Sequence, residues 1–258
     1  MRSTMTTTPR SIGILLLLLT VSLPSAAQLH TIKPDTTSLG KARQRVLQAY
    51  VSGVGEQLAV FTGRLEREYP GNYLEPPYFK TGGMMPGTVW YDGLEYPGLL
   101  LRYDKVRDHV VILSPDSSRK IVLLSERVNQ FYLQDHLFVR LVHDSTPGCP
   151  ATGFYALLCD GDAQLIMGVN HARFNENVGS RNTTSHAVSY TLVDARKFYV
   201  WRNGRYHQLR SPRDLAKIFI DREKELKAYI QSHHIRFSSD NYEEQFTACI
   251  DYLNTLTR

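Results

Sequence analysis

The sequence has few cysteines and a small net charge, and each shortage excludes a class of protein. Three cysteines occur in 258 residues, at Cys149, Cys159 and Cys249. Three cannot make a disulfide framework, although Cys149 and Cys159 could be bridged if their segments turn back on each other. The alternative is that Cys159 and Cys249 are small buried hydrophobes and Cys149 lies in a loop. The formal net charge of +5 is well below the balance typical of nucleic-acid-binding proteins.

Long apolar runs are missing after residue 27, so we expect no transmembrane span in the mature chain. Residues 1–27 have the order of a secretory signal peptide. Arg2 and Arg10 flank the start of this segment, an apolar core with five consecutive leucines follows, and Ser25-Ala26-Ala27 ends it. Cleavage there leaves Gln28 first, with no cysteine for lipid attachment. The sequence thus predicts an exported protein, periplasmic or associated with the outer membrane; the alternative is an uncleaved N-terminal anchor.

Short motifs with known chemistry are missing as well. The chain has no His-Glu-x-x-His, no paired Cys-x-x-Cys, no glycine-rich phosphate loop and no Gly-x-Ser-x-Gly. We therefore predict no cofactor, no metal and no catalytic residues. A hydrolase with an unrecognised site is an alternative, and it requires distant side chains to converge from among these positions: His109, His136, His143, Asp144 and Asp160.

What the sequence does contain is a series of short apolar runs between turn residues. Asp92-Gly93 and Asn203-Gly204 are strong signals for two-residue hairpin turns. Runs at roughly 8–12-residue spacing are typical of an antiparallel sheet. We assign residues 61–210 to a meandering antiparallel β domain, a curved sheet or half-barrel. Residues 28–60 are expected to form a leader with a short helix, and the polar residues 174–185 a loop.

Helical spacing of apolar residues begins after residue 210, which makes the predicted fold class α+β. Ser211 suits an N-cap and Pro212 the first helical position. Apolar residues then recur at helical spacing as far as Ile230, and Asp240 can cap a second helix. We predict that these two helices, within residues 211–258, pack on the sheet.

Two predicted strands, Val110–Leu113 and Ile121–Leu124, are apolar on both faces. A half-exposed antiparallel strand would alternate apolar and polar residues. Either helices and loops cover both faces, or the inner face lines an apolar cavity. The second possibility describes a carrier of a lipid or lipoprotein, with a lumen lined by residues such as Leu101, Val111, Leu123 and Tyr132.

Basic and aromatic residues are interleaved in the predicted hairpin 196–210. The candidate binding residues are Arg196, Tyr199, Trp201, Arg202, Arg205 and Tyr206. Aromatic rings beside arginines can stack on bases or sugars, but an exported protein rarely meets nucleic acid. An envelope protein or an anionic glycolipid is the expected partner, and our first hypothesis is a non-enzymatic binding or accessory protein. The alternative is a solvated hairpin whose charges prevent edge pairing.

Several strand and turn segments occur in a recognisable order. They are 61–66 (FTGRLE), 87–93 (GTVWYDG), 100–104 (LLRYD), 153–155 with 160–161, and 197–200 with 203–204. In this order they resemble an uncharacterised family of exported envelope proteins from Bacteroidota-type bacteria. The resemblance implies a location in the cell envelope. It implies no activity, substrate or site residue.

Overall fold

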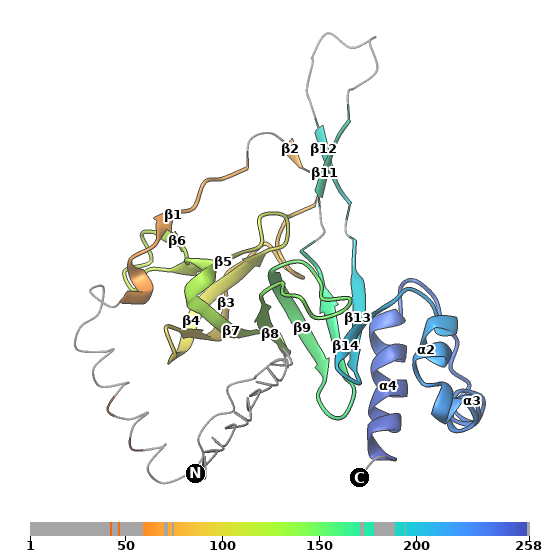
Figure 1. Ribbon diagram of the computed structural model, residues 1–258. Coiled ribbons are helices and arrows are strands. Elements are labelled where there is room, and N and C mark those ends of the chain that lie inside the picture. The colour runs from red at the N-terminus through yellow and green to blue at the C-terminus, as the bar shows by residue number, and fades with distance from the viewer. Residues whose placement is uncertain are drawn as a thin grey trace, which may run out of the picture.

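The computed structural model describes most of the chain after residue 58. The described residues are 42, 46, 59–69, 72–73, 75–170, 173–177, 189–193 and 195–256. They form an eleven-stranded antiparallel sheet, a three-stranded sheet and helices at the C-terminus (Figure 1). The α+β class is therefore confirmed. The predicted signal peptide, leader and short N-terminal helix lie outside the described residues, apart from Ala42, Val46 and the last two residues of the leader range.

The large sheet is a meander except at three pairs of neighbours, β1 with β6, β3 with β7 and β10 with β13. Its strand order is β1-β6-β5-β4-β3-β7-β8-β9-β10-β13-β14. The strands are β1 (Arg64–Leu65), β3 (Met85–Tyr91), β4 (Leu94–Asp104), β5 (His109–Leu113), β6 (Lys120–Val122), β7 (Val128–Leu133), β8 (His136–Leu141), β9 (Gly153–Cys159), β10 (Gln164–Gly168), β13 (Lys197–Arg202) and β14 (Arg205–Leu209). Short 3-10 turns lie at η2 (Ala59–Phe61) and η3 (Ser125–Arg127).

The small sheet projects from the large one as an arm (Figure 1). It consists of β11 (Arg173–Asn177), β12 (Ser189–Val193) and β2 (Asn72–Tyr73), with β12 in the middle. The expectation of a loop over residues 174–185 is wrong for residues 174–177, because pairing with β12 supplies the backbone hydrogen bonds of a strand that lacks an apolar pattern. Residues 178–185 lie outside the described residues.

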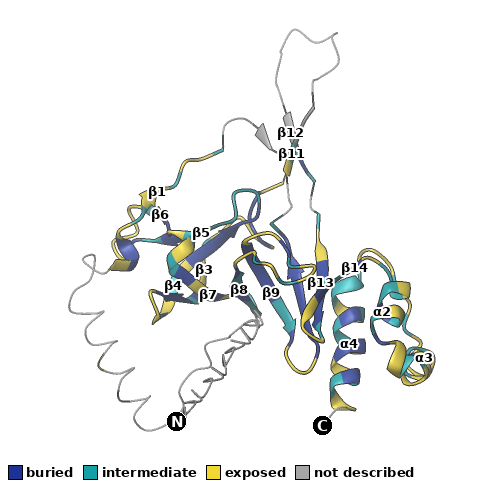
Figure 2. Cartoon of the chain, in the orientation of Figure 1, coloured by how far each residue is buried: buried dark blue, intermediate teal, exposed yellow. Residues whose placement is uncertain are grey.

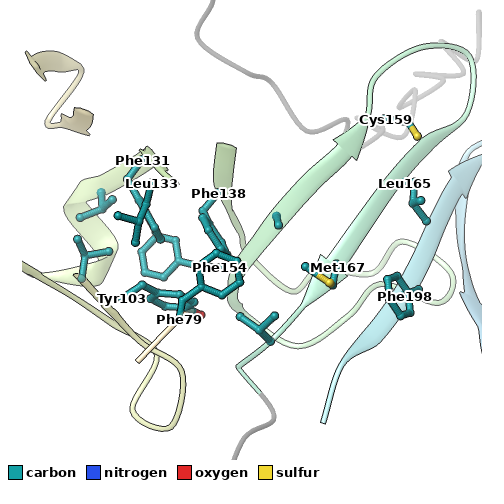
Figure 3. Close-up of a cluster of buried hydrophobic side chains, with 14 of the residues drawn as sticks. Phe79, Tyr103, Phe131, Leu133, Phe138, Phe154, Cys159, Leu165, Met167 and Phe198 are labelled. Carbon is teal, nitrogen blue, oxygen red and sulfur yellow. The ribbon is translucent and has the colours of Figure 1, made fainter. Parts of the chain in front are cut away.

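The large sheet curls around its concave face without closing. The ring of Tyr103 in β4 lies 6.1 Å from that of Phe154 in β9, although three strands separate them in the sheet. Phe131 and Phe138 stack between them at 4.7 Å (Figure 3). Asp108, in the β4–β5 turn, accepts hydrogen bonds from the Tyr103 hydroxyl (2.6 Å) and the Phe154 N–H (3.3 Å). Aromatic packing and one carboxylate thus hold the curved, half-barrel form.

Two-residue turns connect the strands where the sequence predicted them. Asp92 and Gly93 have φ of 51° and 75°, and Asn203 and Gly204 have φ of 52° and 76°. Positive φ at both central residues defines the type I′ turn, whose twist matches that of paired strands. The two predicted hairpins, β3–β4 and β13–β14, are confirmed.

Three α-helices follow the sheet where the sequence predicted two. The Ser211 hydroxyl accepts the N–H of Asp214 and caps the first helix, as expected. The predicted helix from Ser211 to Ile230 is broken at Phe219, because Arg202 of β13 donates to the Ile218 carbonyl at 2.8 Å. The helices are α2 (Pro212–Ile218), the 3-10 turn η4 (Ile220–Arg222), α3 (Glu223–Ser232) and α4 (Tyr242–Thr255).

Helix α4 covers one face of the sheet beside β9, β10 and β13. Its buried stripe consists of Phe246, Cys249, Ile250 and Leu253 (Figure 2). The Phe246 ring lies 5.5 Å from Phe198 of β13. Each side chain of this size stabilises the packing by roughly 1.5–3 kcal/mol. In the last turn, the Asn254 amide bonds to both the N–H (3.0 Å) and the carbonyl (2.9 Å) of Ala163.

The three cysteines are free, so the Cys149–Cys159 bridge that the sequence allowed is not formed. Cys159 and Cys249 are buried, and Cys149 is half-buried in the loop between β8 and β9. Burial raises the pKa of the Cys159 thiol, and it raises the pKa of the Cys249 thiol to about 11. The two buried cysteines are therefore core residues, as the alternative proposed.

In the two runs that are apolar on both faces, residues 110–112 and 121–123 are buried, whereas Leu124 is exposed. Leu101 and Leu123 belong to the concave-side core. Val111 is also buried, but it is paired with Arg102 and points to the other face. Tyr132 is exposed. The four residues expected to line an apolar lumen therefore do not share one cavity, because strand alternation divides them between two faces.

Candidate functional site

The aromatic side chains at the tip of the predicted binding hairpin are buried. Trp201 and Tyr206 are 4% and 2% exposed, and their rings pack together at 4.8 Å. By strand alternation they lie on the face opposite Phe198 and α4. The loop between β8 and β9 runs along them, and its Pro147 carbonyl accepts the Tyr206 N–H at 2.9 Å. If these residues bound a partner as the sequence suggested, Trp201 and Tyr206 would have to be exposed, but this loop and neighbouring strands cover their rings.

The remaining members of that hairpin separate from one another. Arg202 forms two hydrogen bonds with Asp221, at 2.8 and 2.7 Å, and its guanidinium holds the pKa of that carboxyl at about 2. Arg202 also donates to the Ile218 carbonyl, so its contacts with Ile218 and Asp221 hold the chain in place where α2 ends. Arg205 is exposed at the turn, and Tyr199 is half-buried. Arg196 lies at the other end of β13 and faces a pocket.

This pocket, which we call the α4 N-terminal pocket, has a volume of about 310 Å³. Its wall comes from the segment before β3, the end of β4, β10, β12, the start of β13 and the first turn of α4. Phe79, Met167 and Val169 give it a buried apolar floor. Pieces of chain from residue 75 to residue 243 therefore meet at one place that no local pattern connects.

Three cations line the α4 N-terminal pocket: Lys80, Lys105 and Arg196. Lys105 is only 6% exposed, and its backbone N–H is fixed by the Pro77 carbonyl at 2.9 Å. The Lys80 ammonium lies 5.5 Å from the centre of the Phe79 ring. A cation at a buried position attracts a nearby anion more strongly than a cation in water does, because the dielectric constant around it is lower.

Glu243 organises the cationic wall from the first turn of α4. Its Oε1 lies 2.8 Å from His136 Nε2, and its Oε2 accepts from Arg196 at 3.3 Å. The other ring nitrogen of His136 lies 2.9 Å from the Gln134 carbonyl. The bond from His136, with the nearby cations, lowers the pKa of the Glu243 carboxyl. Glu243 is thus an ionised, fully engaged group that positions Arg196.

The residues proposed for a hydrolase have separate partners. In the order His109, His136, His143, Asp144 and Asp160, these partners are Arg64, Glu243, Pro150, Thr146 and Gln164. Within the described part of the chain, no three His, Cys, Asp or Glu side chains are grouped so that they could hold a metal ion. The structure therefore gives this alternative no assembled site.

Sequence reasoning found Arg196 but missed Lys80, Lys105, His136 and Glu243 as its neighbours. Lys80 follows a Pro- and Gly-rich stretch and Lys105 follows a strand, and neither position carries a signal for binding. Only the pairing of residues 77–79 with the end of β4 brings these two lysines to the same wall.

No family model, curated protein or solved structure matches this chain. The resemblance to an exported envelope family therefore stays a prediction. Among the helices that the structure describes, none is both long and apolar enough for a membrane span.

Proposed function

We propose that this chain is a non-enzymatic binding or accessory protein of the cell envelope, and that it binds an anionic group in the α4 N-terminal pocket. The observation that carries the proposal is the convergence of Lys80, Lys105 and Arg196 on one pocket. Ammonium and guanidinium groups form strong charge-assisted hydrogen bonds with phosphate and carboxylate oxygens.

The charge balance of the pocket supports an anion as ligand. Two acids, Glu75 and Glu243, face the three cations. Arg196 and Glu243 offset each other, which leaves Lys80 and Lys105 facing Glu75, an excess of one positive charge. An excess of positive charge in a recessed wall attracts anions and raises their local concentration.

The apolar floor adds a second requirement for the ligand. Phe79, Met167 and Val169 offer carbon surface beneath the cations. A phosphate or carboxylate attached to an apolar body satisfies both parts, as in the headgroup region of an anionic glycolipid. The predicted export of the chain is consistent with a ligand of this kind in the envelope.

The test uses purified residues 28–258 and two probes. Flotation with phosphatidylcholine vesicles, with and without phosphatidylglycerol, measures binding to a lipid anion. Calorimetry with inorganic phosphate measures binding of the anion alone. We expect Arg196→Ala and Lys80→Ala to weaken binding by about tenfold or more, since hydrogen bonds to charged groups are worth 1.5–3 kcal/mol.

The matched control is Lys224→Ala, which removes an exposed cation on α3 away from the pocket. Binding to phosphate but not to vesicles would assign the pocket to a soluble anion or an acidic protein segment. Binding of neither probe, or equal losses in Arg196→Ala and Lys224→Ala, would overturn the proposal.

A further inference from the structure

His136, at the start of β8, lies behind the cationic wall of the α4 N-terminal pocket. Its side chain is 11% exposed, and the centre of its ring lies 5.2 Å from that of Phe79 and 6.3 Å from that of Phe138. Phe79 is part of the pocket floor. Histidine is the side chain whose ordinary change of charge falls between about pH 5 and 8. A histidine at this position therefore links the residues of the pocket to the surrounding pH.

Both ring nitrogens of His136 face oxygen atoms that accept hydrogen bonds. Nε2 lies 2.8 Å from Glu243 Oε1, and Nδ1 lies 2.9 Å from the Gln134 carbonyl oxygen. The bond from His136 and the nearby cations lower the pKa of the Glu243 carboxyl, so this group is ionised. Neither an ionised carboxylate nor a carbonyl has a proton to donate. Only the charged imidazolium, with a proton on each nitrogen, bonds to both oxygens at once.

Lys80 requires the other charge state of His136. Its ammonium nitrogen lies 3.4 Å from the same Nδ1 atom. An ammonium group only donates hydrogen bonds, so Nδ1 accepts from Lys80 only when the ring is neutral and its proton is on Nε2. When His136 takes up a second proton, Nδ1 becomes a donor and the ring becomes a cation beside another cation. The Gln134 carbonyl and the Lys80 ammonium therefore compete for one nitrogen, and the charge of His136 decides which of them is bound.

The charged groups near His136 come from every element around the pocket. They are Glu75 and Lys80 before β3, Lys105 after β4, Asp135 in the β7–β8 turn, Arg196 before β13 and Glu243 in α4. Asp135 is exposed, so water screens its charge. Arg196 and Glu243 offset each other, and the other pocket residues leave an excess of one positive charge. Protonation of His136 adds a second positive charge directly behind the wall.

We propose that His136 is a pH switch of the α4 N-terminal pocket, and that its protonation releases Lys80 to the ligand and tightens anion binding. This inference rests on the proposed function of the pocket. In the neutral state, the ring holds the Lys80 ammonium. In the charged state, Nδ1 donates to the Gln134 carbonyl and the ammonium is free to bond to an oxygen of the anion. Because coupling between two sites is reciprocal, a bound anion also favours the proton on His136.

The test is calorimetry of purified residues 28–258 with sulfate, from about pH 8 to about pH 5.5, the range in which a histidine changes its charge. Sulfate keeps its double charge over this range, whereas inorganic phosphate titrates. We expect the affinity to rise by about fivefold or more as the pH falls, the lower end of common coupling energies. Buffers that differ in ionisation enthalpy should show that sulfate binding takes up protons at about pH 6.5.

His136→Gln is the informative variant, because its amide still donates to Glu243 but does not titrate. Its affinity for sulfate should stay at the alkaline value of the unmodified protein over the whole range. The matched control is His143→Gln, which removes an exposed histidine whose Nδ1 lies 3.0 Å from the Pro150 carbonyl, outside the pocket. This variant should keep the full pH dependence.

NMR of the unmodified protein tests the switch without any variant. Long-range ¹H–¹⁵N spectra of the imidazole show which ring nitrogens carry protons. Nδ1 of His136 should be bare at about pH 8 and protonated at about pH 5.5. Sulfate added at about pH 6.5 should increase the protonated fraction.

The outcomes separate the switch from the pocket. Sulfate binding of equal affinity at both ends of the pH range, or pH dependence that persists in His136→Gln, would overturn the switch and leave the anion pocket standing. A proton on Nδ1 at both ends of the range would also overturn the switch. No sulfate binding at any pH would overturn the pocket and the switch together.

Discussion

The ion pair between Glu66 and Arg102 is almost completely withdrawn from water, so its removal should destabilise the protein strongly. The two side chains are 2% and 9% exposed. The Tyr78 hydroxyl donates to Glu66 at 3.1 Å, and the Tyr78 ring lies 3.8 Å from the guanidinium carbon of Arg102. Arg102 also donates to the Gly82 carbonyl at 3.0 Å. This group of contacts fastens the segment before β3 to β4.

The informative substitution is Glu66→Gln, which keeps the shape and the acceptor for Tyr78 but removes the negative charge. It leaves Arg102 as a buried, uncompensated cation, a change that costs about 3–5 kcal/mol. For a chain of this size the melting temperature should fall by roughly 6–20 °C. Urea unfolding followed by far-UV circular dichroism measures the loss of unfolding free energy.

The matched control is Glu68→Gln. The Glu68 side chain is 84% exposed, with Lys120 at 3.9 Å, so its loss should cost less than about 1 kcal/mol. A triple variant, Glu66→Met with Tyr78→Phe and Arg102→Met, removes both charges and should recover most of the stability. The reasoning is refuted if Glu66→Gln costs no more than Glu68→Gln, or if the triple variant is as unstable as Glu66→Gln.

Three further measurements address other parts of the fold. Burial raises the pKa of the Asp108 carboxyl above 3.8, so the contribution of Asp108 to the free energy of unfolding should decline as pH rises above that value. Asp108→Asn should remove this decline, and an unchanged pH profile of the free energy of unfolding in the variant would contradict the prediction. Buried Cys159 and Cys249, whose thiol pKa values are raised, should react with a thiol reagent only after denaturation; rapid native labelling would show this to be wrong. Trp90 and Trp201 are buried, so iodide should quench the native fluorescence weakly, and strong quenching would count against the covered hairpin face.

Local chemistry determined the parts of the fold that depend on neighbouring residues. Asn203-Gly204 forms a type I′ turn because both positions must adopt positive φ, which Asn and Gly tolerate best. Ser211 and Pro212 begin a helix for two reasons. The Ser211 side chain accepts an N–H that the first turn leaves without a partner, and Pro212 stands where a backbone N–H would have no partner within the helix. Runs such as Val110–Leu113 predicted strands with two apolar faces, and Val110, Val111 and Ile112 are buried.

The candidate sites depended on contacts between distant segments, which the sequence does not encode locally. Alternation places Trp201 on one face of β13, but only the loop between β8 and β9 decides that this face is covered. Helical spacing continues through Phe219, but Arg202 ends the helix from another element.

The α4 N-terminal pocket shows the same division. Alternation, spacing and turn propensity specify which way each side chain points, and this much the sequence by itself determined. Lys80, Lys105 and Arg196 share a wall because the curled sheet brings together residues far apart in the chain. The segments that cover each face were decided only by tertiary packing, since that depends on the shape of the whole domain.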